Sequence, residues 1–231
     1  MIVLSSGNPK IVKSNKSGLG YLTKIMHLAP ATLSGYNTCP WSSPGCRAAC
    51  LNRSGHGYCT PVQETRIKKT KMLFQNPAKF RELLYAELHK FCRKCNKLGV
   101  KPTVRLNGTS DIAWENNVYF SDMFAGFPQI QFYDYTKSFM RALCQEKFDN
   151  YHLIYSRSEK VGDDKNCLTL LRAGVNVAVV FRDKLPKKWH RFQVFDGDKT
   201  DLRFLDPFGV CGLKVKGVGK KDTSGFVVEV S

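Results

Sequence analysis

The sequence predicts an α/β fold: a single domain over residues 1–231, formed as a partial or complete (β/α) barrel with an N-terminal cysteine-rich loop. The chain has 231 residues, is 42% hydrophobic and contains no linker-like stretch, which is typical of one compact unit. In its second half, short β-favouring runs alternate with stretches of helical length. Each run ends in polar residues, as strands do where they open onto an active-site rim.

The first 60 residues form an N-terminal segment that holds a cysteine cluster, and residues 61–231 form the barrel-like core. Residues 1–38 indicate loops and short strands, rich in Gly, Ser and Lys. From about Thr60 the pattern turns helical, with Pro77 breaking it into two helices and Gly99 ending the second. Apolar residues on one face of these helices recur at spacings of three, four and seven: Leu73, Phe74, Phe80, Leu83, Leu84, Leu88 and Phe91.

The second half of the chain predicts about six strands. They lie at residues 103–106, 129–133, 151–155, 175–181, 192–195 and 213–215, with helical stretches at 138–148 and 164–172 between them. This alternation predicts a parallel sheet whose strands are buried on both faces. Because no G-x-G-x-x-G follows a strand, a barrel is favoured over a dinucleotide-binding sheet.

The chain is strongly basic, with 36 Lys and Arg against 19 Asp and Glu and a formal net charge of +17. Such an excess predicts an anionic partner, and nucleic acid is the commonest. An anionic membrane surface, or a basic surface without a specific partner, are the alternatives. No stretch of ~18 apolar residues is present, so a membrane-spanning helix is not expected. No pattern specifies an oligomeric state.

The cysteine content predicts a reducing compartment. Met1 to Ser6 is too short and too weakly apolar for a signal peptide, and the chain holds nine cysteines. Clustered thiols without an export signal more often bind metal than form disulfides. We therefore expect a cytoplasmic protein.

Three cysteines, Cys39, Cys46 and Cys50, lie within twelve residues on a segment broken by Pro and Gly. Cys46 and Cys50 are one helical turn apart, so both can face one centre. Thiolates are soft ligands, which favours a [4Fe–4S] cluster or zinc. A fourth ligand from Cys59 or His56 would complete a tetrahedral zinc site. Without one, a [4Fe–4S] cluster would keep one iron open for a substrate or for S-adenosylmethionine.

Polar side chains at the predicted strand ends are candidates for catalysis. These candidate catalytic residues are Asp111, Lys137 and Glu159. Asp111 also has the sequence context of a helix N-cap, and Lys137 that of a surface lysine. Glu159 also has the simpler alternative of an ion pair with Arg157.

Further polar residues near the same strand ends are candidates for binding a cofactor or substrate. These are Asn107, Ser110, Asp134, Arg157 and Asp198. Asp198 lies in the acidic segment Asp196–Asp201, which resembles a cation-binding loop but lacks the spacing of one and so favours a turn. Several polar tails on successive strands predict one shared rim.

Three sequence motifs of this chain resemble those of a known protein family. The segment Cys39–Cys50 with Ser-Pro-Gly before the second cysteine, then Arg105–Asp111 and Phe132–Lys137, resembles the phage gene product 88 family over nearly the whole chain. It is similar, more distantly, to the three-cysteine-motif phage proteins, which are considered radical-SAM-like partial barrels. The resemblance implies a phage origin, a host-cell cytoplasmic location, a radical-SAM-like barrel and an iron–sulfur cluster on the three cysteines of the first segment. The chain departs from the C-x3-C-x2-C spacing that is standard in radical-SAM enzymes, because no cysteine stands three residues after Cys50.

The leading hypothesis is a phage-type metal-cluster enzyme that acts on nucleic acid or a nucleotide. One alternative is a zinc-containing, base-modifying barrel like a DNA transglycosylase, with Asp111, Asp134 or Asp198 as its nucleophile. Another alternative is a non-enzymatic, metal-stabilised protein that binds nucleic acid or inhibits a host function.

Overall fold

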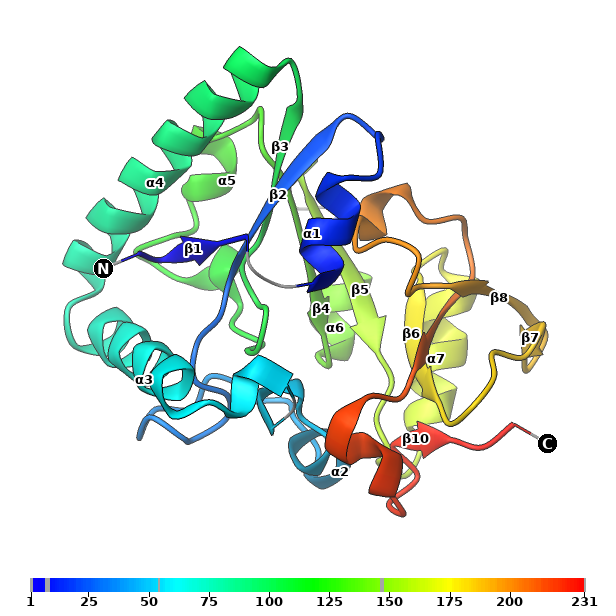
Figure 1. Ribbon diagram of the computed structural model, residues 1–231. Coiled ribbons are helices and arrows are strands. Elements are labelled where there is room, and N and C mark those ends of the chain that lie inside the picture. Colours follow the sequence, from blue (N-terminus) through cyan, green and yellow to red (C-terminus); the bar gives the residue numbers. More distant parts are fainter. Residues whose placement is uncertain (1, 7–8, 54, 146–147, 231) are drawn as a thin grey trace.

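The parallel strands of one sheet lie side by side in nearly the order in which they follow along the chain (Figure 1). The computed structural model describes residues 2–6, 9–53, 55–145 and 148–230. Its strands are β1 (Leu4–Ser5), β2 (Tyr21–Met26), β3 (Lys101–Arg105), β4 (Gln131–Thr136), β5 (Tyr151–Ser156), β6 (Val177–Phe181), β7 (Lys188–Trp189), β8 (Phe192–Asp196), β9 (Val210–Lys214) and β10 (Val227–Val228). Their order is β1-β2-β3-β4-β5-β6-β9-β8-β7, and β10 also pairs with β6.

Helices fill most of the connections between the strands. The α-helices are α1 (Pro9–Asn15), α2 (Pro44–Ala48), α3 (Thr60–Gln75), α4 (Pro77–Leu98), α5 (Met123–Gly126), α6 (Phe139–Leu143) and α7 (Asp163–Arg172). Short 3₁₀ turns are η1 (Leu51–Arg53), η2 (Gly55–Tyr58), η3 (Trp114–Asn116), η5 (Arg203–Leu205) and η6 (Gly217–Lys221). The predicted α/β class is thus confirmed.

The sheet is parallel from β2 through β3, β4, β5 and β6 to β9, and β8 continues it in parallel. Only the short β1 and β7 run antiparallel to their neighbours. Among the described residues no pairing joins the β1 end to the β7 end, so the structure shows no closed barrel.

The long helical segment follows the local signals of the sequence. Asn76 separates α3 from α4, and its side chain accepts a hydrogen bond from the Lys79 amide at 3.0 Å, so it caps the helix in which Pro77 occupies the first turn. Gly99 ends α4 with a φ of 63°, a left-handed conformation that glycine adopts without strain. Both predicted helix boundaries are confirmed.

The two faces of the sheet have different surroundings. One face packs against the helices, where Val104 and Phe132 join the aromatic core beneath α4 and α5. On the opposite face, Tyr135 packs with Ile154 and Cys211 in a smaller cluster. Because side chains alternate along a strand, β4 sends neighbouring residues to opposite faces.

The sequence pattern missed part of the sheet. β2 lies in the segment expected to hold loops and short strands, yet it pairs with β3 along five residues. The N-terminal segment therefore supplies β1 and β2 to the same sheet as the rest of the chain. Within the described part of the chain, none of the helices has the length and apolar character needed to cross a membrane.

Candidate functional site

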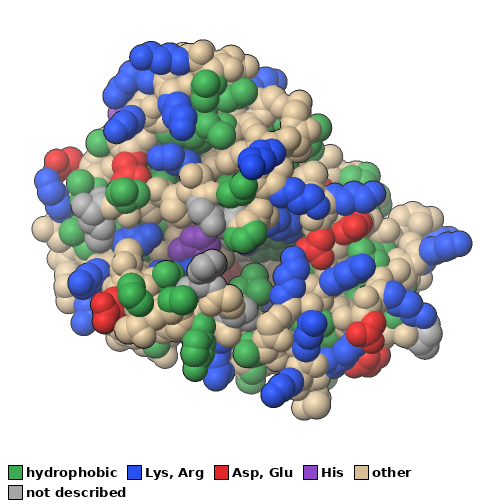
Figure 2. Space-filling view, in the orientation of Figure 1, with side chains coloured by type: hydrophobic (Ala, Val, Ile, Leu, Met, Phe, Trp, Pro, Cys, Tyr) green, Lys and Arg blue, Asp and Glu red, His purple; other side chains and the backbone are tan. Residues whose placement is uncertain are grey.

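A cavity of about 430 Å³ opens at the carboxyl ends of the parallel strands. Its walls come from α1, the cysteine segment around α2 and η1, the ends of β3, β4 and β5, and the chain from β9 to β10. In Figure 1, α2 lies below the strand ends beside the C-terminal part of the chain. Carboxyl ends of parallel strands are where α/β proteins place their ligand sites. The face viewed in Figure 2 is hollowed near its centre, with Lys and Arg side chains along part of the edge.

Three of the four predicted metal ligands reach this cavity. Cys39, Cys46 and Cys50 all line it, and each is a free, half-buried thiol. Cys59 is exposed, is not among the lining residues, and occupies the N-cap position of α3. The side chain of His56 lies outside the described residues. The fold thus places Cys39, Cys46 and Cys50 along one cavity, whereas Cys59 lies outside it.

The segment that carries Cys46 is fastened to the end of β5 by Glu159. Its carboxylate accepts hydrogen bonds from the Ser43 hydroxyl at 2.6 Å and the Gly45 amide at 2.7 Å. Ser43 in turn caps α2 by accepting from the Cys46 amide at 3.2 Å. Glu159, a candidate catalytic residue, does not line the cavity but holds the cysteine segment in place.

The Ser-Pro-Gly sequence before Cys46 has a steric reason. A Cβ atom on Gly45 would lie 2.8 Å from the Glu159 carboxyl carbon and 2.8 Å from the Phe226 Cβ. Three segments far apart in the sequence therefore meet at this glycine, and a side chain there would push them apart.

Burial keeps the three thiols in their neutral form at neutral pH. Burial, with smaller contributions from the nearby Cys50 and Asp111, raises the pKa of Cys39 to about 11. Burial also raises the pKa of Cys46, with Glu159 adding to the rise and Lys137 opposing it. The pKa of Cys50 is raised by burial and by its neighbour Cys46. Cys50 thus acts on the pKa of Cys39, and Cys46 on that of Cys50, and a bound cation would displace the protons of these thiols.

Asp111 and Lys137 meet on the rim as the strand-end pattern predicted. Both line the cavity, and the Asp111 carboxylate accepts from the Lys137 amide at 2.8 Å and from Arg141 Nη1 at 2.6 Å. The Asp111 amide donates to the Thr38 carbonyl at 2.8 Å, which ties this loop to the cysteine segment. Burial raises the pKa of Asp111, and Arg141 opposes that rise most strongly.

The amino group of Lys137 is directed to the end of β5. It donates to the Ser156 carbonyl and hydroxyl, both at 3.0 Å, and to the Arg157 carbonyl at 2.8 Å, and it lies 4.9 Å from the centre of the Phe226 ring. The amino group therefore places a positive charge at the junction of two strand ends and the C-terminal segment.

Asn107 organises the loop after β3. Its side-chain oxygen accepts from the Ser110 hydroxyl at 2.8 Å, the Ile112 amide at 2.9 Å and Trp114 Nε1 at 3.2 Å. Its amide group donates to Asp134 at 3.1 Å. Asn107 and Ser110 both line the cavity, so this network sets the shape of its wall.

Two other predicted binding residues do not reach the cavity. Asp134 belongs to β4 and is fully buried, accepting from Asn107 and from the Tyr151 hydroxyl at 3.0 Å; burial raises its pKa to about 7. Arg157 pairs with Asp164 at 2.6 Å and does not line the cavity. Neither of the two simple alternatives, the Arg157–Glu159 ion pair or the Asp111 N-cap, describes the contacts observed for these residues.

The last candidate, Asp198, lines the cavity and pairs with Lys216 at 2.7 Å. The neighbouring Asp201 lines it too and is 1% exposed, holding Lys10 at 3.2 Å and Arg105 at 3.1 Å. Lys10 and Arg105 were not identified from the sequence as candidate site residues. Arg105 could have been found as a charged residue near the end of the predicted strand 103–106, whereas nothing local marks Lys10.

Comparison with known proteins gives one match. The family model described as gene product 88 matches residues 2–230. No curated protein and no solved structure matches the chain. Since the match spans all of the elements that build the cavity, from α1 to β10, the chain belongs to the gene product 88 family.

Proposed function

We propose that this protein is a phage iron–sulfur enzyme that holds a [4Fe–4S] cluster on Cys39, Cys46 and Cys50 and acts on a nucleotide or nucleic acid. The observation that carries the proposal is that these three thiols line one cavity at the strand ends. Three thiolates are a soft donor set suited to iron–sulfur clusters. Three protein ligands leave one iron of such a cluster open, and the bound cluster would supply a binding point and an electron for S-adenosylmethionine.

The number of thiols at the cavity favours a cluster over a structural zinc ion, because Cys59, which was expected to complete a zinc site, does not line the cavity. Over the part of the chain that the structure describes, no three His, Cys, Asp or Glu side chains are arranged to hold one ion. A radical-SAM-like partial barrel agrees with the sequential, open order of the strands.

The contacts of the carboxylates disfavour the transglycosylase alternative. A nucleophilic aspartate needs an oxygen directed at the substrate, but both oxygens of Asp111, of Asp134 and of Asp198 already accept hydrogen bonds. In the proposed enzyme Asp111 instead fixes the β3 and β4 strand ends relative to one another, and Lys137 contributes positive charge. The net charge of +17 supports a phosphate-bearing substrate.

Purification without oxygen tests the proposal. We expect a brown protein with about four irons and four acid-labile sulfides per chain, and release of 5′-deoxyadenosine from S-adenosylmethionine when a reductant is added. Cys39→Ala, Cys46→Ala and Cys50→Ala each lose the iron, whereas Cys59→Ala, the matched control outside the cavity, retains it. A colourless protein with stoichiometric zinc would contradict the proposal.

A further inference from the structure

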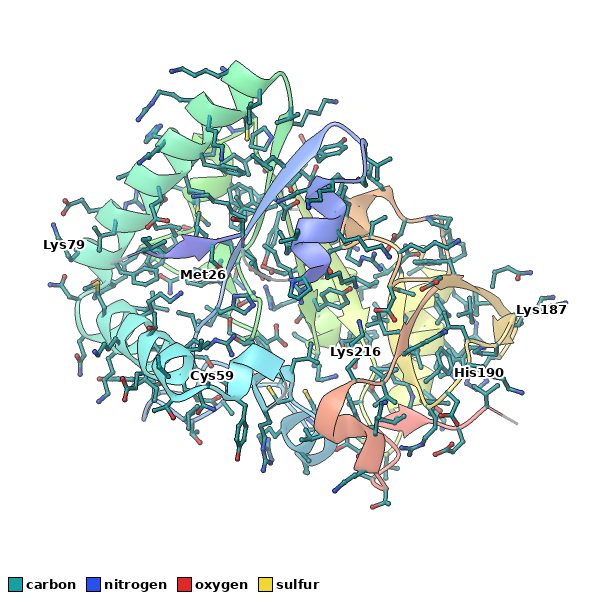
Figure 3. All side chains as sticks on the ribbon, viewed as in Figure 1. Met26, Cys59, Lys79, Lys187, His190 and Lys216 are labelled. Carbon is teal, nitrogen blue, oxygen red and sulfur yellow. The ribbon has the colours of Figure 1, made fainter. Side chains whose placement is uncertain are left out.

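The cavity has a second chemical character away from the thiols. Lys10, Arg105, Lys214 and Lys216 also line it, and they come from α1, the end of β3 and the chain after β9 begins. In Figure 3, Lys216 lies near the middle of the view, between α1 and the C-terminal part of the chain. Cations from three distant parts of the sequence therefore converge on one wall, which we call the basic wall.

Two acidic residues hold the basic wall in position. The buried carboxylate of Asp201 binds Lys10 at 3.2 Å and Arg105 at 3.1 Å, and it also accepts from the Tyr133 hydroxyl at 3.0 Å. The carboxylate of Asp198 binds Lys216 at 2.7 Å and the Lys214 amide at 3.0 Å. Because the side chains of Lys10, Arg105 and Lys216 are already oriented, an anionic ligand would bind without ordering them.

Arg105 has a hydrogen-bonding capacity that the described residues do not use. Its guanidinium stacks 4.5 Å from the Tyr135 ring centre and pairs with Asp201 only through Nη1. Its Nε is buried and has no acceptor in the described part of the chain. A buried donor without a partner costs free energy and marks a place for an absent acceptor. Arginine is well suited to supply two parallel hydrogen bonds to a phosphate or carboxylate.

The charge balance of the cavity matches a phosphate monoester. Among the described residues, five basic side chains line it (Lys10, Arg105, Lys137, Lys214, Lys216) against three acidic ones (Asp111, Asp198, Asp201). This formal excess of two positive charges is opposite in sign and close in magnitude to the charge of about −1.5 to −2 that a phosphate monoester carries at neutral pH. A cavity of about 430 Å³ lies within the range of small-molecule sites.

We propose that the basic wall is a phosphate subsite for a nucleoside monophosphate, with the phosphate held by Arg105, Lys10 and Lys216. The apolar side chains of Val180 and Leu213, which also line the cavity, offer surface to the base. The subsite deepens the proposed function and its role in a reaction rests on it, but phosphate binding itself does not require the cluster.

Calorimetric titration of the full chain tests the subsite with AMP, GMP, CMP and TMP, the matching nucleosides, inorganic phosphate and acetate. We expect at least one monophosphate to bind, and its nucleoside to bind at least tenfold more weakly. Lys216→Gln weakens the monophosphate roughly tenfold, because one charge-assisted contact is lost. Lys79→Gln is the matched control: Lys79 and Lys216 have 50% and 54% exposed side chains and each pairs with one carboxylate, but Lys79 lies at the far edge of the molecule (Figure 3).

The subsite proposal would be overturned if a nucleoside bound as tightly as its monophosphate, or if acetate competed as well as phosphate. It would also be overturned if oligonucleotides bound while no mononucleotide did, or if Lys216→Gln and Lys79→Gln lowered the affinity for the monophosphate equally. The triple variant Cys39→Ala/Cys46→Ala/Cys50→Ala separates the two proposals. It loses iron if the cluster proposal holds, and it still binds the monophosphate if the subsite proposal holds. The experiment therefore distinguishes a failure of the cluster proposal from a failure of the subsite proposal.

Discussion

Replacing Arg141 by Gln removes a cation that pairs with two buried carboxylates beside the cavity, Asp111 and Glu115. Its guanidinium binds Glu115 through two contacts of 2.6 and 3.0 Å and Asp111 through one of 2.6 Å. The Arg141 side chain is 5% exposed, and its two partners are 11% and 10% exposed. Breaking a buried pair costs about 3–5 kcal/mol, because an uncompensated charge is left inside the protein.

The size of the effect follows from this burial. For a chain of this length each kcal/mol lowers the melting temperature by roughly 2–4 °C, so we expect a fall of about 6–20 °C for Arg141→Gln. The deficit also depends on pH. Without the arginine the pKa of Asp111 rises further, so the folded variant retains protons that the unfolded chain releases. Its stability relative to wild type therefore falls as pH rises from 5 to 8.

Arg81→Gln is the matched control. Arg81 makes a similar two-contact pair with Asp122, at 2.6 and 2.5 Å, but the side chains are 32% and 61% exposed. Exposed pairs contribute about 0–1 kcal/mol, so its melting temperature falls by at most about 4 °C. Thermal and urea unfolding followed by circular dichroism measure both variants. If the free energies of unfolding of the two variants differ by less than about 1 kcal/mol at pH 8, the reasoning from burial is refuted.

Three further predictions concern the supports of the site. Glu159→Ala releases the cap of α2, so iodoacetamide modifies Cys46 faster than in wild type by peptide mass spectrometry, while an unchanged rate would show that Glu159 does not hold this segment. Burial raises the pKa of Asp134 to about 7, above its ordinary value of 3.8, so the protonated carboxyl stabilises the folded state, and this stability is lost as pH rises toward and past 7. Asp134→Asn should therefore flatten the dependence of the free energy of unfolding on pH, measured by urea unfolding from pH 5 to 8. Parallel curves for the wild type and the variant would contradict this prediction. Exposed Cys144 should be alkylated far faster than buried Cys167, whose pKa burial raises, and equal rates would argue against the fold at α6 and α7.

The parts of the fold that sequence reasoning recovered are those with local signals. Pro77 and Gly99 mark helix ends through constraints on their own backbone, so α3 and α4 could be placed to within a few residues. The strand runs and the polar residues after them predicted a shared rim, and Asp111 and Lys137 do meet there. These features depend on spacing along the chain, which the sequence displays directly.

The misplaced residues depend on geometry that the sequence does not display. The second predicted strand ended at Tyr133, but β4 continues to Thr136, so Asp134 lies within the strand and alternation turns it to the face opposite Tyr135. Glu159 has the residue type and position of a catalytic acid, but its partners come from a segment more than 100 positions earlier. The pairing of Lys10 with Asp201 spans almost the whole chain and has no local pattern.

The contribution of Phe226 to the cavity has a consequence for biosynthesis. All the other lining residues, from Pro9 to Gly219, leave the ribosome before it does. The wall of the cavity beside Gly45 is therefore the last part to be completed, when the segment that carries Phe226 is made and β10 pairs with β6.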